Sequence, residues 1–499
     1  MRRTLRRSCA ACAKAKHKCD LHTPRCSRCT LRNVQCVYAN EPLSSPGPSR
    51  SASAIIQGNE SSKSSLSTLP MIIGSNSFDP FDSYPPTSLP RSRVQNLIVH
   101  FLSKIAFQYY PLDLNPISNP FINSWWPLAL ADPALFNVSL QTASLDAELH
   151  AQKGFHQSEI LMHDAVSLIR HKIDDPTLAF QDATMDAVVT LAAIEHGKGN
   201  SHECKMHIDA VKRMVAVRGG IAAVKESSPL TARMVPWVSM LVTGSPQFGV
   251  QDDFGNGDGI APIDLWLPAL KTEHKPDIPG LTDFHIDFSL RDIQIRLGVI
   301  LNPTVSSGAY ISTNDLHDLT CYVLHKLLLP FPTELTSISE SFRYALATYM
   351  FIIHGPTYYS HAAILHNIVL QLRYHLQAAI TSNKKDSSLL IWCLSVGMSA
   401  SIGTDANDWF MTHATTLARS EGLETWESVE SCLQSILAID AQSKAIFHTA
   451  WQPMFNSSAP MEEPPGDPST TLKVLLDHEN SVHSMNGPVS PAESSPNAR

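Results

Sequence analysis

Six cysteines near the amino terminus constrain this chain more than any other feature of its sequence. They follow the spacing Cys9-x2-Cys12-x6-Cys19-x6-Cys26-x2-Cys29-x6-Cys36. The unit C-x2-C-x6-C therefore occurs twice, and the second copy is displaced by 17 residues from the first. The other four of the ten cysteines are scattered through the rest of the chain. A repeat this regular predicts a compact module built from two similar halves.

The number of sulfurs indicates which chemistry holds the module together. A structural zinc site is tetrahedral, and cysteine thiolates are its usual ligands. Two zinc ions need eight ligand positions, and six sulfurs fill them only if two sulfurs bridge both metals. We therefore expect two Zn2+ per chain, bound by six cysteines. The alternative is a disulfide framework, which is typical of small secreted domains. It is disfavoured because residues 1–7 are basic and no apolar run of a secretory signal follows them.

Charge separates this cysteine-rich head from the rest of the chain. Residues 1–40 contain ten Lys or Arg and a single acid, Asp20, which gives a net charge of +9. The whole chain carries −8, so residues 41–499 carry −17. Such a split predicts a basic head that binds a polyanion and an acidic body that does not. The pairs Arg2-Arg3 and Arg6-Arg7 are also typical of nuclear import signals, so we expect a nuclear protein.

Residues 8–38 resemble the fungal-type binuclear zinc cluster (Zn(2)-C6) transcription factors. The resemblance includes Asp20 after the third cysteine, Pro24 before the fourth and Tyr38 after the last. It implies which sulfurs bind which metal: Cys9 and Cys26 bridge, Cys12 and Cys19 complete one zinc, and Cys29 and Cys36 complete the other. The alternative from another class is a zinc-dependent protein-interaction module without DNA readout.

The same resemblance implies how the head meets double-stranded DNA. The sequence favours two short helices, one over the alanines after Ser8 and one over Ser27–Leu31. In the family the first helix enters the major groove, and Lys16 matches its base-reading lysine. We expect phosphate contacts from the other cations of the module: Lys14, Lys18, Arg25, Arg28 and Arg32. Ala13 and Ala15 replace basic residues of the family pattern, so the preference for CGG-type half-sites is open.

Composition divides the remainder of the chain. Residues 41–90 contain eight prolines and fourteen serines, which is typical of a disordered linker. Residues 91–454 are apolar with a mostly helical period, and residues 455–499 are rich in Pro, Ser and acids, which indicates a disordered tail. We therefore expect an all-α chain with a small zinc module and a large helical domain.

Apolar residues recur at helical spacing through most of this domain. Positions 94, 98, 101 and 105 follow a heptad-like spacing that is too short for a coiled coil, and they indicate an amphipathic helix that opens the domain. Further helices are expected at 181–196, 201–218, 316–329, 340–353, 359–380, 389–398, 405–421 and 427–449. The domain is long enough to bury a large core, arranged as two packed halves.

Two segments of this domain resemble the all-helical regulatory domain of fungal zinc cluster factors. They are residues 125–136, which begin with two tryptophans, and residues 186–220, which end in Arg218-Gly219-Gly220.

Two other clusters of possible metal ligands in this domain carry little functional signal. His196, His202, Cys204 and His207 do not align on one helical face as metal ligands would. Residues 252–259 lack the carboxylates of a calcium loop and are expected to form an exposed turn.

These observations predict a sequence-specific DNA-binding regulator of RNA polymerase II genes, such as the pathway-specific regulator of a secondary-metabolite gene cluster. The expected partners are double-stranded DNA, the transcription machinery and a second copy of the chain. No catalytic motif is found, so an enzyme is not expected. No stretch approaches the roughly 18 consecutive apolar residues of a membrane span.

Overall fold

The structure is a computed structural model of the whole chain. It describes residues 10–15, 17–18, 27–32 and 34 of the head, and residues 84–152, 154–270, 286–301, 311–358, 361–382, 387–437, 439 and 441–456 of the body. Two compact units are present, residues 1–67 and residues 68–499. Most of the predicted linker, up to residue 83, and the predicted tail from residue 457 lie outside the described residues.

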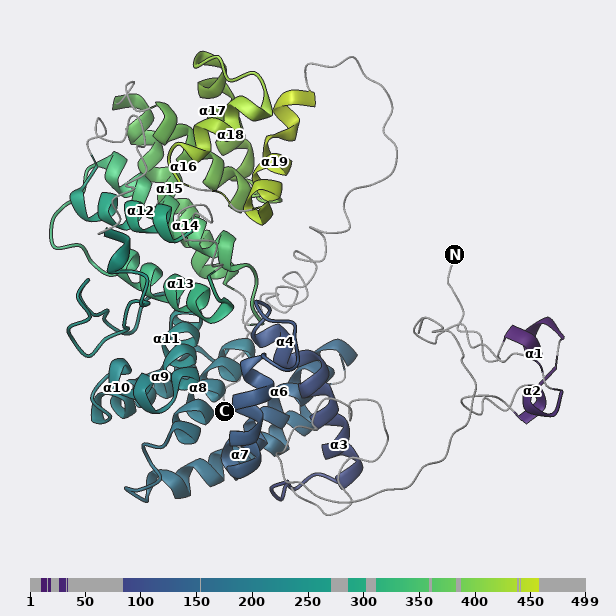
Figure 1. The fold of residues 1–499 in the computed structure, drawn as a ribbon. Helices are drawn as coiled ribbons and strands as arrows, with labels where there is room; N and C mark the ends of the chain where they lie inside the picture. The colour runs from purple at the N-terminus through teal and green to yellow at the C-terminus, as the bar shows by residue number, and fades with distance from the viewer. Residues whose placement is uncertain are drawn as a thin grey trace, which may run out of the picture. The chain divides into compact units, whose positions relative to one another are not determined.

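The head contains two helices of five residues each. They are α1 (Ala10–Lys14) and α2 (Ser27–Leu31), and they contact one another (Figure 1). The predicted helix over Ser27–Leu31 is confirmed at both ends. Ser8, the residue expected to begin the first helix, lies outside the described residues.

The described part of the body is helical, and no strand occurs in it beyond a single backbone bridge between Val250 and Ile260. The predicted all-α fold is confirmed. Its first half contains α3 (Arg91–His100), the π-helix η1 (Phe101–Ile105), α4 (Ala106–Tyr109), the π-helix η2 (Phe121–Trp125), α5 (Trp126–Ala131), α6 (Pro133–Ala151), α7 (His156–Ile173), α8 (Asp182–Gly197), α9 (Ser201–Val217), α10 (Ile221–Ser227) and α11 (Pro229–Thr243).

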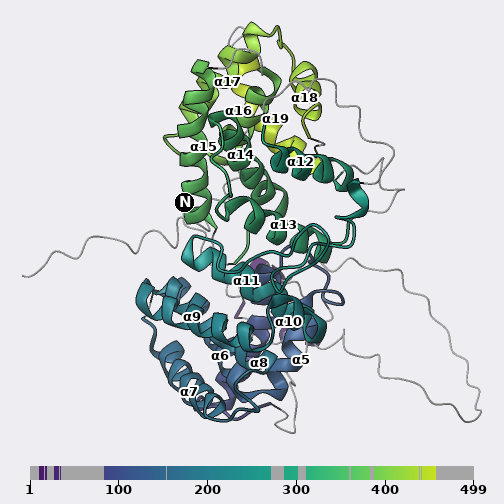
Figure 2. The same ribbon diagram turned by 90° about the vertical axis from the view of Figure 1, so that its left-hand side faces the viewer.

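The second half follows the short 3-10 helix η3 (Pro268–Leu270). It contains α12 (Phe288–Ile300), α13 (Thr313–Leu328), α14 (Ser337–His354), α15 (Ala362–Ser382), α16 (Ser387–Ala400), α17 (Asn407–Ser420), α18 (Trp426–Gln434) and α19 (Ala441–Asn456). Figures 1 and 2 show the two sets of helices one above the other. None of the described helices combines the length and the apolar character needed to cross a membrane.

Helix α6 lies at the centre of the first half, in contact with α3, α7 and α8. Its start is fixed by Asp132, whose carboxylate accepts hydrogen bonds from the Ala134 and Leu135 amides at 3.0 Å. Such a side chain satisfies backbone donors that a helix start leaves without partners. Because α6 is covered on most sides, both its apolar and its polar residues are buried. The amphipathic helix predicted from position 94 is confirmed, since Val94, Ile98 and Phe101 are buried in this core.

Helix α14 has the corresponding place in the second half, in contact with α12, α13, α15 and α16. Trp392 of α16 is fully buried and packs edge-on against Phe342 of α14. Helices α16 and α17 approach closely because residue 397 is glycine. A Cβ atom there would lie 2.2 Å from the Phe410 ring, which is too close for any side chain.

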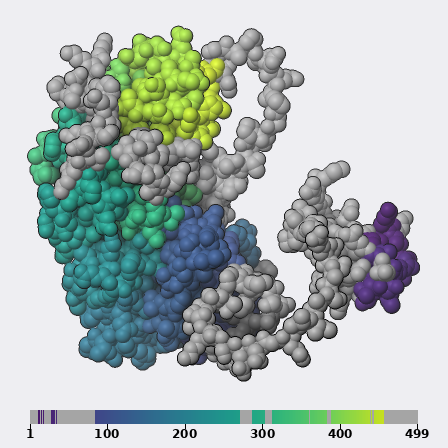
Figure 3. Space-filling view, in the orientation of Figure 1, coloured from purple at the N-terminus to yellow at the C-terminus, as the bar shows by residue number. Residues whose placement is uncertain are grey.

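The two halves meet at a buried seam between α11 and α13. Arg233 of α11 donates two hydrogen bonds to the Asp318 carboxylate of α13, at 2.6 and 3.0 Å. Beside them, His317 Nδ1 lies 2.9 Å from His354 Nε2, and the Trp237 ring packs on both imidazoles. Burial lowers the pKa of His354 to about 4 and that of His317 well below its usual 6.5, so both rings are neutral. In the space-filling view the teal surface runs between the halves without a gap (Figure 3).

One predicted helix is wrong. The segment 427–449 was expected to form a single helix, but α18 ends at Gln434 and α19 begins at Ala441. The break has a tertiary cause, because the Gln294 side chain of α12 donates a hydrogen bond to the Ile436 carbonyl. Ile436 and Leu437 are buried at the same place. A periodicity within one segment cannot reveal a competing donor from a helix more than a hundred residues away.

Candidate metal centre and nucleic-acid interface

The repeat in the cysteine spacing is accompanied by a repeat in the backbone hydrogen bonds of the head. At the end of α1, the Ala15 amide donates to the Ala11 carbonyl at 3.1 Å and the His17 amide donates to the Cys12 carbonyl at 2.9 Å. At the end of α2, 17 residues later, the matching bonds join Arg32 to Arg28 and Val34 to Cys29, each at 3.1 Å. Both helices therefore end with the same pattern of backbone hydrogen bonds, although their sequences share little apart from the cysteine.

The two cysteines that the structure describes in the head are buried. Cys12 and Cys29 are 3% and 2% exposed, whereas Leu31 of α2 is 86% exposed. Paired thiols on two contacting short helices fit the donor set of a structural zinc site. The other four predicted ligands, Cys9, Cys19, Cys26 and Cys36, lie outside the described residues, so the ligand assignment stays a prediction.

The cations expected to contact DNA are accessible wherever the structure describes them. Lys14, Lys18, Arg28 and Arg32 are all exposed. Two of them lie on α2 or directly after it, so the second half-unit contributes to the basic surface as well as the first. Lys16, the predicted base contact, and Arg25 lie outside the described residues. The roles of all six cations stay predictions.

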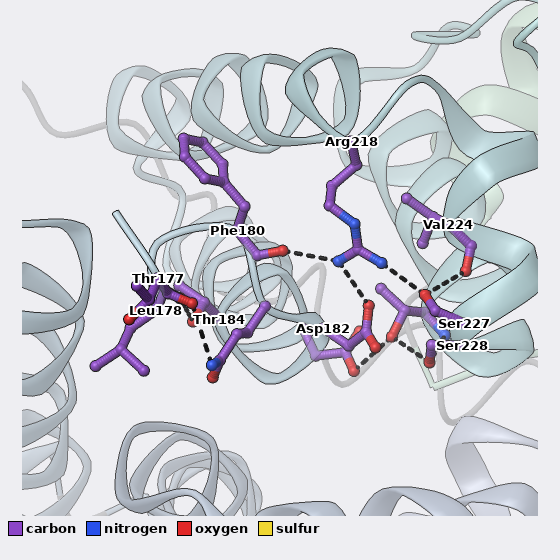
Figure 4. A network of polar contacts seen from close by, with 12 residues as sticks. Thr177, Leu178, Phe180, Asp182, Thr184, Arg218, Val224, Ser227 and Ser228 are labelled. Atoms are coloured by element: carbon purple, nitrogen blue, oxygen red, sulfur yellow. Dashed lines mark hydrogen bonds and ion pairs between the residues drawn. The ribbon is translucent and has the colours of Figure 1, made fainter. Parts of the chain in front are cut away.

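In the body, Arg218 joins three helices at the end of α9 (Figure 4). One guanidinium nitrogen, Nη1, donates to the Phe180 carbonyl at 2.7 Å and to the Asp182 carboxylate at 3.0 Å, both at the start of α8. The other, Nη2, donates to the Ser227 hydroxyl at 2.6 Å, at the end of α10. Arginine suits this place because its planar group donates in several fixed directions at once. Sequence reasoning noted Arg218 only as part of a resemblance and missed this contact.

The two glycines after Arg218 allow the chain to pass close to the loop that contains Asp258. Gly219 and Gly220 have φ angles of +90° and +96°, a region that side chains disfavour. A Cβ atom on Gly220 would lie 2.2 Å from the Asp258 carbonyl oxygen, which accepts a hydrogen bond from the Ala222 amide. The prediction that residues 252–259 form an exposed turn is therefore only partly correct. Phe254 is 76% exposed, but the end of the loop packs against the start of α10.

A buried carboxyl group lies near this network. Asp186 of α8 is 1% exposed, and its carboxyl accepts a hydrogen bond from the Thr231 hydroxyl of α11 at 2.9 Å. Burial raises the pKa of the Asp186 carboxyl to about 8, because the charged form loses its hydration. The sequence signal was available, since an acid stands among the apolar residues of a predicted helix. The raised pKa of Asp186 depends on its burial beside α11, and the sequence does not show where α11 packs.

The histidines and cysteine considered as metal ligands do not converge. The side chain of His202 is 90% exposed, whereas Cys204 is 3% exposed and faces the core. Among the residues that the structure describes, no group of three His, Cys, Asp or Glu side chains is placed to hold a metal ion.

Segments in both parts of the chain match known protein-family models. Residues 7–45 match the fungal Zn(2)-Cys(6) binuclear cluster domain, and residues 96–242 match the fungal specific transcription factor domain. A Gibberella fujikuroi protein named as a transcription factor is 35% identical over 88 residues, which are 17% of this chain and 12% of that protein. The peroxisome proliferation transcriptional regulator of Saccharomyces cerevisiae is 60% identical over 30 residues, 6% of this chain and 3% of that protein.

The similarity to these two relatives is local, since this chain covers far less than two thirds of either of them. No solved structure matches the chain. Both predicted resemblances are nevertheless confirmed, one over the cysteine repeat and one over the first half of the helical body.

Proposed function

We propose that this chain, which has the two domains of a fungal Zn(2)-Cys(6) transcription factor, binds double-stranded DNA in the nucleus and regulates transcription there. The observation that carries the proposal is the repeated half-unit of the head, with its two buried cysteines and its exposed cations. A charge of +9 on residues 1–40 favours a polyanionic partner.

The six cysteines of the head would hold two Zn2+. When bound, the zinc ions fix the positions of the two short helices. In this proposal the module spans residues 8–38, Cys9 and Cys26 each bind both metals, Cys12 and Cys19 complete one site, and Cys29 and Cys36 complete the other. The burial of Cys12 and Cys29 supports one ligand in each half-unit.

The base-reading residue of the module is Lys16. It stands between the second and third cysteines in the sequence, and a helix held at both ends by zinc-bound sulfurs would bring its side chain to the groove at little entropic cost. A lysine in the major groove can donate to guanine O6 and N7, as a CGG-type half-site requires. The exposed cations Lys14, Lys18, Arg28 and Arg32, together with Arg25, would contact phosphates, which position a protein without reading sequence.

The test compares Lys16→Ala with Arg28→Ala on a preferred duplex and on a scrambled duplex over a series of salt concentrations. The loss of Lys16 should cost roughly 1–3 kcal/mol on the preferred site and much less on the scrambled one. The loss of Arg28 should weaken both about equally and reduce the salt slope by about one. Equal losses on both duplexes for Lys16→Ala would show a phosphate contact, and no duplex binding by the zinc-loaded chain would refute the proposal itself.

The helical body, proposed as residues 91–454, would control this activity rather than catalyse a reaction. Its match to a transcription factor domain and its acidic balance support that role. Deleting it should leave zinc binding by the head intact but change the strength or the control of transcription. A reporter driven as strongly and as responsively by the head alone would contradict this.

The targets proposed for the chain are RNA polymerase II genes, reached through the transcription machinery, and in particular the genes of a secondary-metabolite cluster. The two-domain architecture supports a pathway-specific regulator. Genome-wide mapping of the binding sites tests this: sites concentrated in the promoters of one biosynthetic cluster would support the proposal, and sites spread over unrelated genes would contradict it.

A further inference from the structure

The loop that contains Asp258, residues 249–260, holds an exposed asparagine, Asn256, that is followed by a glycine. Asparagine is a thermolabile residue, because the next backbone nitrogen can attack its side-chain carbonyl and displace the amide. A glycine after the asparagine favours this attack, since it has no side chain to shield the nitrogen and its backbone turns freely. Among the described residues, Asn256 is the one asparagine followed by glycine.

The backbone nitrogen next to Asn256 is not engaged elsewhere. Gly257 is exposed, has a φ angle of +113°, and its N–H donates no hydrogen bond to any residue that the structure describes. Asn200 provides a comparison, because it is exposed as well and its side-chain amide is also held by a carboxylate, that of Glu195. The residue after it, Ser201, carries a side chain, and its N–H donates to the Gly199 carbonyl at 3.1 Å. The two asparagines therefore differ in the availability of the attacking nitrogen.

The turn around Asn256 is closed by Asp252. One oxygen of the Asp252 carboxylate accepts a hydrogen bond from the Asn256 side-chain amide at 2.9 Å, and the other accepts from the Asn256 backbone amide at 2.8 Å. The Asn256 carbonyl accepts from the Asp252 backbone amide at 3.0 Å. An ionised carboxylate accepts hydrogen bonds but cannot donate them. The closed turn therefore depends on a donor in the side chain at position 256.

We propose that Asn256 is a site of spontaneous deamidation in the folded chain, and that the reaction loosens this loop from α10. The Gly257 nitrogen attacks Cγ of Asn256, so that a C–N bond forms and the Cγ–Nδ2 bond breaks. The proton of the Gly257 nitrogen leaves with Nδ2 as ammonia, and a cyclic succinimide remains. Water then opens the ring at either carbonyl and gives aspartate or isoaspartate at position 256. The attack needs no partner molecule, because the backbone holds the reacting atoms together.

Either product places a new negative charge beside Asp252. The loop already contains Asp252, Asp253 and Asp258, of which Asp253 lies 2.7 Å from the Lys326 ammonium. The product loses the donor that Asp252 binds, and two adjacent carboxylates repel each other. Isoaspartate also lengthens the main chain by one atom, which displaces the Gly257 carbonyl from the Gln251 side-chain amide that donates to it at 2.8 Å. Both products therefore open the turn.

The opening of the turn reaches α10 because the loop packs against the start of this helix. The Asp258 carbonyl, two residues after Asn256, accepts a hydrogen bond from the Ala222 amide at 3.2 Å. The same carbonyl lies where Gly220 leaves room for it. A displaced residue 258 weakens the bond to Ala222, so the exchange of the Ala222 amide proton with solvent reports the state of position 256.

Peptide mapping of the ageing chain tests the chemistry. The zinc-loaded full chain is kept at neutral pH in water enriched in heavy oxygen, and samples are digested and analysed by mass spectrometry over time. Asn256 should convert at least about tenfold faster than Asn200, a difference of about 1.4 kcal/mol in activation free energy. The product should contain one oxygen from water. Asn256→Ser keeps a hydroxyl that can donate to Asp252, and it should show no conversion at position 256.

Hydrogen exchange at Ala222 tests the structural consequence. In Asn256→Asp this amide should exchange about two- to tenfold faster than in the fresh parent chain, which is the effect of losing one hydrogen bond. Asn200→Asp makes the same change of charge at a matched exposed position and should leave the exchange of Ala222 unchanged. As the parent chain ages, its exchange should approach that of Asn256→Asp, whereas aged Asn256→Ser should keep its starting value.

Three results would overturn the inference: conversion of Asn256 no faster than that of Asn200, a product without oxygen from water, or equal exchange of the Ala222 amide in Asn256→Asp and the fresh parent chain. None of these measurements needs DNA, so a failure of the proposed DNA binding would not affect them.

Discussion

The head and the body of this chain are stabilised in different ways. In the described part of the head, the buried side chains on α1 and α2 are the sulfurs of Cys12 and Cys29. In the body, a single cluster of buried apolar residues extends from Val94 to Met454. A five-residue helix is far below the roughly 12–15 residues at which an isolated helix becomes marginally stable. The difference predicts that the head depends on bound zinc for its fold, whereas the body depends on its hydrophobic core.

Removal of zinc should give the largest difference in stability between the head and the body. Structural zinc contributes on the order of 10 kcal/mol to the folding of small modules, so excess chelator should unfold the head and abolish duplex binding. The body should keep its helical circular dichroism and its melting temperature. Elemental analysis should give two zinc ions per chain before chelation. A shared loss of structure in head and body, or duplex binding that survives chelation, would contradict the comparison.

A second test concerns how the burial of one carboxyl group, Asp186, lowers the stability of the body. The pKa of the Asp186 carboxyl is about 8 in the folded chain, well above its usual value of 3.8. The unfolded chain therefore releases this proton first, and the free energy of unfolding falls as pH rises from about 4 to 8. At about 1.4 kcal/mol per pKa unit, a shift of about four units corresponds to a loss of roughly 6 kcal/mol. Asp186→Asn removes the titrating group, so the stability of this variant should fall less over the same range.

Denaturant unfolding of the parent chain and the Asn variant at pH 5 and pH 8 measures this difference. Asp264→Asn, at an exposed position before the second half, serves as the control and should keep the pH dependence of the parent. The same pH dependence in all three chains would show that Asp186 is ionised in the fold.

A smaller effect on stability is expected from substitutions of Gly219 and Gly220, where the chain passes close to the loop of residues 249–260. Gly219→Ala places a side chain at a positive φ, which costs about 1–2 kcal/mol, but its Cβ meets only Ala223 at an ordinary 3.5 Å. Gly220→Ala adds the contact with the Asp258 carbonyl oxygen, so it should cost about 1–3 kcal/mol more. Thermal unfolding of both variants measures the difference. Equal costs would show that the loop moves aside freely, and zinc content should not change in either variant.

The sequence predicted the elements of both regions better than their contacts. The helix Ser27–Leu31 and the body helices α3, α8, α9 and α13 to α17 follow from local patterns, because an apolar stripe or a cysteine repeat is visible within one segment. Helices α6, α7, α11 and α12 were not among the predicted segments. The cysteine repeat predicted a module of two similar halves, and the matching hydrogen bonds at the ends of α1 and α2 agree with that prediction. These features need no knowledge of which segments meet.

Contacts between distant segments could not be predicted in the same way. The break before α19 depends on Gln294 of α12, and the three bonds of Arg218 depend on where α8 and α10 lie. Residues 252–259 were predicted to form an exposed turn because their sequence does not show that the chain at Gly220 packs against Asp258. For Lys16 the resemblance remains the sole basis, since its position lies outside the described residues.

The seam between the halves has a consequence for how the body forms during synthesis. Tyr110 donates its hydroxyl hydrogen bond to the Thr313 carbonyl at 3.0 Å, across a separation of 203 residues. Chains emerge from the ribosome at about 5–20 residues per second and domains tend to fold in order. The first half is therefore synthesised roughly 4–14 seconds before α13 begins to emerge. The side of the first half that will contact α13 stays exposed to solvent during that interval. We expect the nascent chain to be most prone to aggregation, and most dependent on chaperones, while translation passes through the second half.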